Sequence, residues 1–166
     1  MNPATLVERL AAALRSAGAT MATAESCTGG LVAAACTDRA GSSDWFERGF
    51  VCYSNAAKVE LLGVAAPLIA THGAVSSEVA LAMARGALAW SPARFAVAVT
   101  GIAGPGGGTE VKPVGTVWLA VCERGDSAEA TLLQASGDRA AVRARAVERA
   151  LELLLDAIGR AVAGSA

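Results

Sequence analysis

The stretch FAVAVTGIAGPGGG, residues 95–108, joins a buried strand to a glycine-rich turn. Residues 95–100 are a continuous apolar run of strand length, which is typical of a strand covered on both faces of a sheet. Five glycines follow within residues 101–108, more than a chain reversal requires. The backbone N–H groups of this turn and the Thr100 hydroxyl could therefore face a ligand, and a simple flexible loop is the alternative.

The same arrangement occurs earlier, where an apolar stretch near 19–25 runs into TAESCTGG, residues 23–30. Hydrophobic periodicity predicts helices near 4–17, 28–38, 54–64, 76–90 and from about 138 onward. Further strands are predicted near 48–54, and at 114–122 and 128–135, which read as a hairpin. Strands and helices alternate first and the hairpin comes late. This order predicts one domain over residues 1–166, an α/β fold in which a mixed, mostly parallel sheet lies inside a three-layer α/β/α sandwich.

Composition limits the kinds of partner. The chain has 166 residues, of which 54% are hydrophobic and 17% charged, so a sizeable core is expected. The net charge is −1, and no basic stretch favours nucleic acid or an anionic membrane. No run of 18 apolar residues predicts a membrane span, and charges at Glu8, Arg9 and Arg15 interrupt the N-terminal apolar residues, so no signal core is expected.

The cysteines and the histidine argue against metal chemistry. None of the four cysteines, which are Cys27, Cys36, Cys52 and Cys122, forms a C-x-x-C pair, and His72 is the only histidine. We therefore expect reduced cysteines in a cytoplasmic protein, with no metal and no organic cofactor.

Ser26 stands where the first strand gives way to a helix, so it is a candidate nucleophile. In α/β folds, the loops after parallel strands gather ligands. The N–H groups of Cys27, Thr28, Gly29 and Gly30 are expected to be free at the helix start, where they could hold a phosphate or a developing oxyanion. The alternative is that Ser26 or Thr28 merely caps the helix.

A nucleophilic serine needs a base. Lys58 is expected in the first turn of its helix, where the helix dipole disfavours a cation and lowers the pKa of the amine. The alternative is a solvated lysine. His72 lies in a predicted loop, where a structural hydrogen bond is the plainer role, and Cys27 lacks a histidine partner. Glu25 could act as a base or orient the neighbouring loop.

Six stretches in this order resemble one family: TAESCTGG, GSSDWFERGFVCYSNAAKVELLGV, HGAVS, TGIAGPGGG, KPVGTVW and GDRAAVR. From about Thr20 to Leu155 the chain is similar to the CinA C-terminal domain family, in the stand-alone form of the nicotinamide-nucleotide amidohydrolases (PncC type). The resemblance implies deamidation of nicotinamide mononucleotide in pyridine nucleotide salvage, without a cofactor, by a homo-oligomer. Cys52 stands where threonine is common in that family.

The resemblance also implies the site residues. It assigns the nucleophile to Ser26, the base to Lys58 and an active-site tyrosine to Tyr53. Substrate-binding positions are implied at Ser43, Thr100, Gly101 and Arg139, with Arg143 as a weaker alternative to Arg139. Two other functions remain open: a non-catalytic nucleotide-sensing or partner-binding module, which would not need Lys58, and a serine amidase for another carboxamide.

Overall fold

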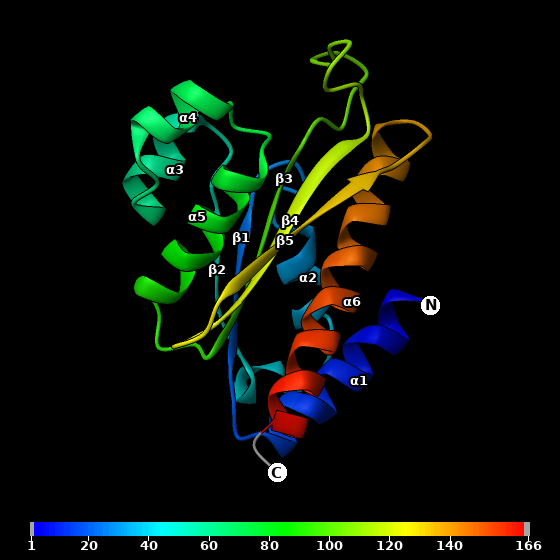
Figure 1. The fold of residues 1–166 in the computed structure, drawn as a ribbon. Helices are drawn as coiled ribbons and strands as arrows, with labels where there is room; N and C mark the ends of the chain where they lie inside the picture. The colour runs from blue at the N-terminus through cyan, green and yellow to red at the C-terminus, as the bar shows by residue number, and fades with distance from the viewer. Residues whose placement is uncertain (1, 165–166) are drawn as a thin grey trace.

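A five-stranded sheet of order β2-β1-β3-β4-β5 forms the middle layer of the computed structural model, which describes residues 2–164 (Figure 1). β1 (Met21–Glu25), β2 (Phe46–Val51) and β3 (Phe95–Gly101) are parallel. β4 (Thr116–Glu123) is antiparallel to β3, and β5 (Ala128–Gln134) reverses again to complete the hairpin. All strands except β4 therefore run in one direction, which confirms the mixed, mostly parallel sheet.

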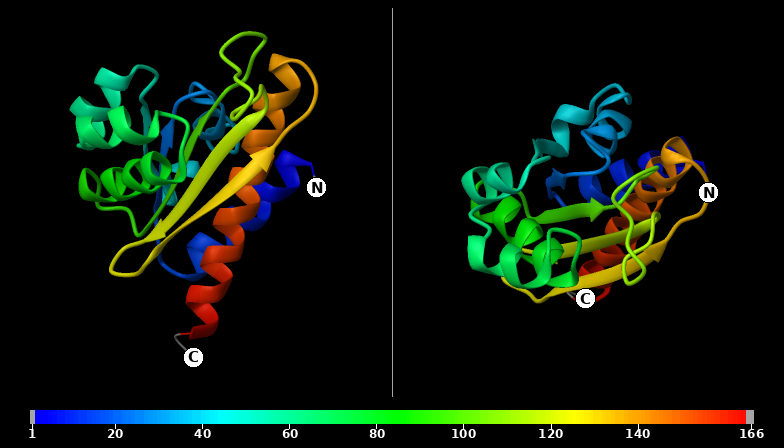
Figure 2. Two further views of the ribbon diagram at one scale, coloured as in Figure 1. Left: turned by 45° about the horizontal axis from the view of Figure 1, so that its top comes forward. Right: turned by 90° about the horizontal axis from the view of Figure 1, so that it is seen from above.

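Helices cover both faces of the sheet (Figure 2). One face carries α1 (Pro3–Ser16), α2 (Leu31–Thr37) and α6 (Arg139–Gly164). The other carries α3 (Asn55–Leu62), α4 (Ala66–His72) and α5 (Ser77–Ala89). A short 3-10 helix, η1 (Ser42–Asp44), precedes β2. The predicted three-layer sandwich is confirmed.

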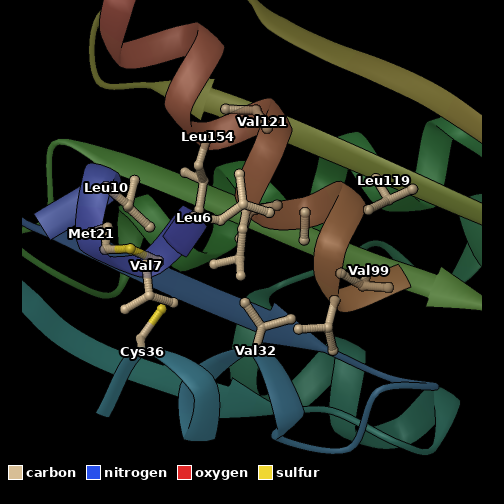
Figure 3. Packing of buried hydrophobic residues seen from close by; sticks show 14 of the residues in the cluster. Leu6, Val7, Leu10, Met21, Val32, Cys36, Val99, Leu119, Val121 and Leu154 are labelled. Atoms are coloured by element: carbon tan, nitrogen blue, oxygen red, sulfur yellow. The ribbon is translucent and has the colours of Figure 1, made fainter. Parts of the chain in front are cut away.

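The alternation of side chains along the strands explains the two layers. In β3, the large residues Phe95, Val97 and Val99 join the core under α1, α2 and α6. Figure 3 shows Val99 in this core. Ala96 and Ala98 face the other way, into the cluster built around α5. Small residues on this face let α5 pack close to the sheet, and Gly86 of α5 lets α3 approach closely as well. A Cβ atom at this glycine would lie 2.2 Å from the carbonyl oxygen of Leu62.

Local signals in the sequence fix the ends of α3 and α5. Ser54 and Ser76 accept hydrogen bonds from the N–H groups three residues later, and Gly63 ends α3 in the left-handed conformation.

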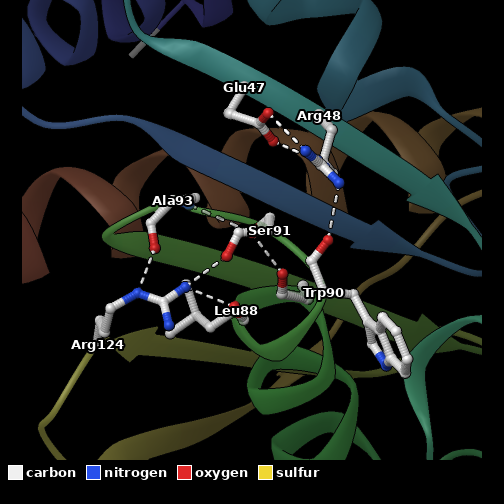
Figure 4. A network of polar contacts seen from close by, with 8 residues as sticks. Glu47, Arg48, Leu88, Trp90, Ser91, Ala93 and Arg124 are labelled. Atoms are coloured by element: carbon white, nitrogen blue, oxygen red, sulfur yellow. Dashed lines mark hydrogen bonds and ion pairs between the residues drawn. The ribbon is translucent and has the colours of Figure 1, made fainter.

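At the far end of α5, Arg124 donates hydrogen bonds to the carbonyl oxygens of Leu88, Ser91 and Ala93, which ties the β4–β5 hairpin to that helix (Figure 4). Within residues 2–164, no helix combines the length and apolar character that crossing a membrane requires.

Three sequence-based boundaries were wrong. α4 was not predicted, and His72, which was expected in a loop, is the last residue of this helix. α2 begins at Leu31, since Gly29 and Gly30 adopt positive φ angles in the preceding turn. β2 ends at Val51, and the next two carbonyl groups leave the sheet to contact the Lys58 side chain.

Candidate active site

A cavity of about 280 Å³ opens at the carboxyl ends of β1 and β3. Its walls come from the turn after β1, the start of α3, the segment between α4 and α5, the glycine-rich turn after β3, and the first residue of α6. The lining residues are Ser26, Cys27, Tyr53, Asn55, Lys58, Ala74, Val75, Thr100, Gly101, Ile102, Ala103, Gly104, Gly106, Gly107 and Arg139. The cavity thus joins the two turns that the sequence singled out.

Ser26 is the first residue beyond β1. Its N–H group donates to the carbonyl oxygen of Val99 in β3, which holds the residue against the sheet. Its hydroxyl lies 3.5 Å from the carbonyl oxygen of Tyr53 and 3.2 Å from the Nζ atom of Lys58. The side chain is only 8% exposed but lines the cavity. The hydroxyl can therefore meet a ligand while it contacts the amine.

Lys58 is buried, with 1% of its surface exposed. Besides Ser26, its Nζ atom contacts the carbonyl oxygens of Cys52 at 3.2 Å and Tyr53 at 3.4 Å. No carboxylate among the described residues forms an ion pair with it. Burial removes water from the charged form of the amine, which lowers the pKa of Lys58 below the usual lysine range.

The first turn supplies fewer free N–H groups than the sequence suggested. Gly29 donates to the carbonyl oxygen of Ser26, and Gly30 donates to the Glu25 side chain. Neither glycine lines the cavity, so the expectation that their N–H groups hold an anion was wrong. The N–H groups of Cys27 and Thr28 have no recorded acceptor in another described residue, but Thr28 is fully buried and does not line the cavity. Cys27 therefore carries the one cavity-lining N–H of this turn that has no acceptor in another described residue.

The second turn is richer in free donors. Within residues 2–164, no acceptor is recorded for the N–H groups of Ala103, Gly104, Gly106 or Gly107, all of which line the cavity. Gly104 and Gly107 have positive φ angles, which only glycine adopts readily. Several N–H groups gathered at one concave surface suit an anion.

Thr100 and Gly101 line the cavity as the sequence analysis expected. The Thr100 hydroxyl donates to the carbonyl oxygen of Ala74 at 2.8 Å, so its oxygen is left to accept a hydrogen bond from a ligand. Gly101 has no room for a side chain, because a Cβ atom there would lie 2.7 Å from Val117 Cγ2.

Arg139 and Tyr53 close one side of the cavity. The Arg139 guanidinium donates to the carbonyl oxygen of Gly104 at 2.8 Å and to the Tyr53 hydroxyl at 3.0 Å. Tyr53 is 60% exposed, and its contact with Ser26 and Lys58 is made through its carbonyl oxygen. The described residues that line the cavity include no aspartate or glutamate, and Arg139 adds a positive charge, so the site favours an anionic ligand.

Two other candidates lie outside this site. Ser43 belongs to η1, which precedes β2, whereas the cavity lies beyond the opposite end of the parallel strand β1. Within one chain the structure therefore does not bring Ser43 to Ser26. His72 is near Glu78, with 3.5 Å between Nδ1 and Oε1, and it does not line the cavity.

The cysteine next to Ser26 is poorly suited to act as the nucleophile. Burial raises the pKa of Cys27 to about 11, against the lowering effect of its own backbone N–H and of Arg143. Its thiol therefore stays protonated near neutral pH.

Sequence reasoning did not predict that Asn55 lines the cavity, and it left the roles of Glu25 and Arg143 open. Asn55 lines the cavity in the first turn of α3, and its place directly after the Ser54 cap was the available signal. Glu25 accepts hydrogen bonds from backbone N–H groups of Gly30 and α2, and Arg143 donates to carbonyl groups of the first turn. Neither contact has a sequence signature, because both depend on tertiary packing.

A family model described as the CinA C-terminal domain matches residues 3–158. The chain belongs to the CinA C-terminal domain family. Among curated CinA-family relatives, the nicotinamide-nucleotide amidohydrolase PncC of Escherichia coli K12 is 53% identical over 149 residues, covering 90% of both chains. The protein of the same name from Pseudomonas putida is 54% identical over 156 residues, covering 93% of this chain and 97% of its own.

A solved CinA-family structure has the same fold. The competence/damage inducible protein CihA from Agrobacterium tumefaciens superposes with a TM-score of 0.91 at 47% identity, covering 95% of each chain. The family match confirms the resemblance found in the sequence, and the relatives confirm the expectation that the chain is an enzyme.

Proposed function

We propose that this chain is a nicotinamide-nucleotide amidohydrolase, which converts nicotinamide mononucleotide and water to nicotinic acid mononucleotide and ammonia in pyridine nucleotide salvage. One observation carries the mechanism: the buried amine of Lys58, without an ion-pair partner in the described chain, lies 3.2 Å from the Ser26 hydroxyl. The two relatives named PncC support the choice of substrate.

The contacts of Lys58 can be satisfied with the amine in its neutral form. A neutral amine has two N–H groups and one lone pair, and the carbonyl oxygens of Cys52 and Tyr53 accept the two N–H groups. In the structure Nζ donates to the Ser26 hydroxyl, which donates in turn to the carbonyl oxygen of Tyr53. For the reaction we assign the lone pair of the neutral amine to Ser26, whose hydroxyl rotates to donate its proton to Nζ. Burial lowers the pKa of Lys58 and so favours this form of the amine.

The reaction runs in two halves. Ser26 Oγ attacks the carboxamide carbon while its proton passes to Lys58, and a tetrahedral oxyanion forms. The C–N bond then breaks, and the leaving nitrogen takes the proton from Lys58 and departs as ammonia. Water attacks the resulting ester with Lys58 again as the base, which releases the carboxylate and restores the Ser26 hydroxyl.

The two turns bind different parts of the substrate. The N–H group of Cys27, adjacent to the nucleophile, is the donor we assign to the oxyanion. The phosphate is assigned to the second turn, where four free N–H groups and Arg139 meet. Arg139 keeps further N–H groups for this purpose, because only two of its nitrogen atoms have partners in the described chain.

The test is ammonia release from nicotinamide mononucleotide. Ser26→Ala and Lys58→Met are each expected to lower kcat by about 10³-fold or more, since each removes a group that acts in the transition state. Ser16→Ala and Lys112→Met are matched controls, which remove an exposed serine and the other lysine of the chain. Both controls should keep wild-type activity.

Other results would redirect the assignment. Undiminished release by Ser26→Ala or Lys58→Met would remove the role given to that residue. Tight nucleotide binding in calorimetry without ammonia release would favour a nucleotide-sensing module. Release from another carboxamide in a substrate panel, but not from nicotinamide mononucleotide, would favour a different serine amidase.

A further inference from the structure

The buried carboxylate of Glu25 is outside the proposed chemistry, yet it lies next to the nucleophile. Glu25 is the last residue of β1 and only 1% exposed. Its backbone is fixed in the sheet, where its carbonyl oxygen accepts a hydrogen bond from Cys52 at 2.8 Å. The side chain therefore starts from a backbone position that the sheet holds in place.

From there the carboxylate reaches across the turn to α2. Oε2 accepts hydrogen bonds from the N–H groups of Gly30 at 3.1 Å and Val32 at 3.0 Å, and Oε1 accepts one from Ala33 at 2.9 Å. No cation among the described residues forms an ion pair with it, so these donors and the positive end of α2 compensate its charge.

These bonds leave the start of α2 with no donor for an external anion. Gly29 donates to Ser26 and Leu31 donates to Thr28, so every N–H group of residues 29–33 has an acceptor inside the chain. A substrate phosphate would have to displace the Glu25 carboxylate to bind here. The first turn is therefore left to contact the carboxamide group of the substrate, and the phosphate binds at the second turn.

Arg143 holds the same turn from the other side. One turn of α6 beyond Arg139, its Nε donates to the carbonyl oxygen of Cys27 at 3.1 Å and its Nη2 donates to that of Thr28 at 3.2 Å. A planar guanidinium can bind two neighbouring carbonyl groups at once and so fixes the orientation of both peptide units. The N–H group of Cys27 shares a peptide plane with the carbonyl group of Ser26. That carbonyl group accepts a hydrogen bond from the N–H of Gly29, in the peptide unit whose carbonyl group Arg143 binds at Thr28.

We propose that Glu25 and Arg143 are positioning residues for Ser26. Glu25 ties the end of β1 to the start of α2, and Arg143 ties the middle of the turn to α6. Between them the Ser26 hydroxyl is held against Lys58, and the N–H of Cys27 is held toward the cavity. This inference rests on the proposed function for its kinetic consequence, but the tethering of the turn can be measured without substrate.

The first arm of the test is kinetic. Glu25→Gln keeps the shape of the side chain but puts an N–H₂ group in place of one acceptor, so at least one N–H of α2 loses its partner. A small displacement of reacting groups can cost about 10²-fold, so kcat for nicotinamide mononucleotide should fall by about that factor. KM should change little, because the phosphate is bound by the other turn. Arg143→Lys should also lower kcat with KM retained.

The second arm is hydrogen–deuterium exchange over residues 26–33, measured without nucleotide. Exchange should become faster in Glu25→Gln. The control is Leu154→Ala, which removes a buried side chain about 22 Å further along α6 than Arg139. It should lower the melting temperature but leave both kcat at 25 °C and exchange over residues 26–33 unchanged.

The outcomes separate the two proposals. Glu25→Gln with wild-type kcat, or with unchanged exchange over residues 26–33, would overturn the positioning role. Equal losses of kcat in Glu25→Gln and Leu154→Ala would reduce Glu25 to a general stabilising residue and also overturn it. If wild-type protein releases no ammonia from nicotinamide mononucleotide, the proposed function fails, and the exchange arm still decides whether Glu25 holds the turn.

Discussion

The Nζ atom of Lys58 lies 3.2 Å from the Oγ atom of Ser26, although 32 positions separate the two residues in the sequence. The contact follows from topology, because β1 and β2 are parallel neighbours and their carboxyl ends lie at the same edge of the sheet. Ser26 follows β1 directly, and Lys58 lies one turn into α3, which follows β2. The side chains of a helix lean toward its N-terminus, so Lys58 reaches back over this edge.

The rate should rise with pH through the pKa of Lys58. The base must be neutral, so the protonated amine at low pH is inactive and the neutral amine at higher pH is active. Because burial lowers this pKa, the rise of kcat/KM should occur below the usual lysine range. A pH–rate profile for nicotinamide mononucleotide measures it. A rate that falls as the pH rises through this range would contradict the role of Lys58.

Removing the guanidinium of Arg139 should affect phosphate binding selectively. A hydrogen bond to a charged group contributes about 1.5–3 kcal/mol, which corresponds to a rise in KM of roughly tenfold to a hundredfold in Arg139→Ala. Nicotinamide riboside lacks the phosphate, so its kcat/KM should change much less. Arg145→Ala, which removes an arginine paired with Glu148 on the same helix, is the control. Equal losses for both substrates would argue against phosphate binding by Arg139.

Tyr53→Phe should separate the two groups that this residue contributes. The carbonyl oxygen that contacts Lys58 remains, while the hydroxyl that binds Arg139 is lost. A neutral hydrogen bond contributes about 0.5–1.5 kcal/mol, so KM should rise by about twofold to tenfold with kcat retained. Steady-state kinetics measure both values. A fall in kcat of about 10²-fold or more would instead assign the hydroxyl to proton transfer.

Cys27 should be dispensable for the chemistry. Its pKa of about 11 keeps the thiol protonated, and the donor that we assign to the oxyanion is its backbone N–H, which any substituted residue except proline retains. Cys27→Ala should therefore keep most of the activity, and iodoacetamide at pH 7.5 should leave this cysteine unmodified in folded protein. Mass spectrometry of the alkylated peptides gives the second readout. Rapid modification of Cys27 that abolishes activity would support a thiol nucleophile.

Local patterns were enough to predict most of the fold. The apolar run 95–100, the serine caps and the late hairpin each depend on neighbours in sequence, and the corresponding elements were found. α4 was missed because a seven-residue helix without a capping side chain carries little local signal. Ser26, Lys58 and Thr100 were also singled out from the residues themselves, and Arg139 was implied by the family resemblance; all four line one cavity.

The donors of the first turn could not be predicted in the same way. Any glycine after a strand suggests a free N–H group, but whether that group is free depends on distant side chains. Glu25 takes the N–H of Gly30, and Arg143 comes from a helix more than 100 positions away to bind the carbonyl groups of the same turn. Such contacts arise only when the layers pack together.

The protonation of Lys58 can be observed directly, because the chain contains only two lysines. In a Lys112→Arg variant labelled with ¹³C-lysine, the single side-chain signal belongs to Lys58, and its chemical shift can be followed against pH by NMR. The predicted result is a midpoint clearly below that of the same protein denatured in urea, coinciding with the midpoint of the pH–rate profile. A midpoint equal to or above that of the denatured chain would mean that the amine is charged at working pH, and would contradict its role as the base for Ser26.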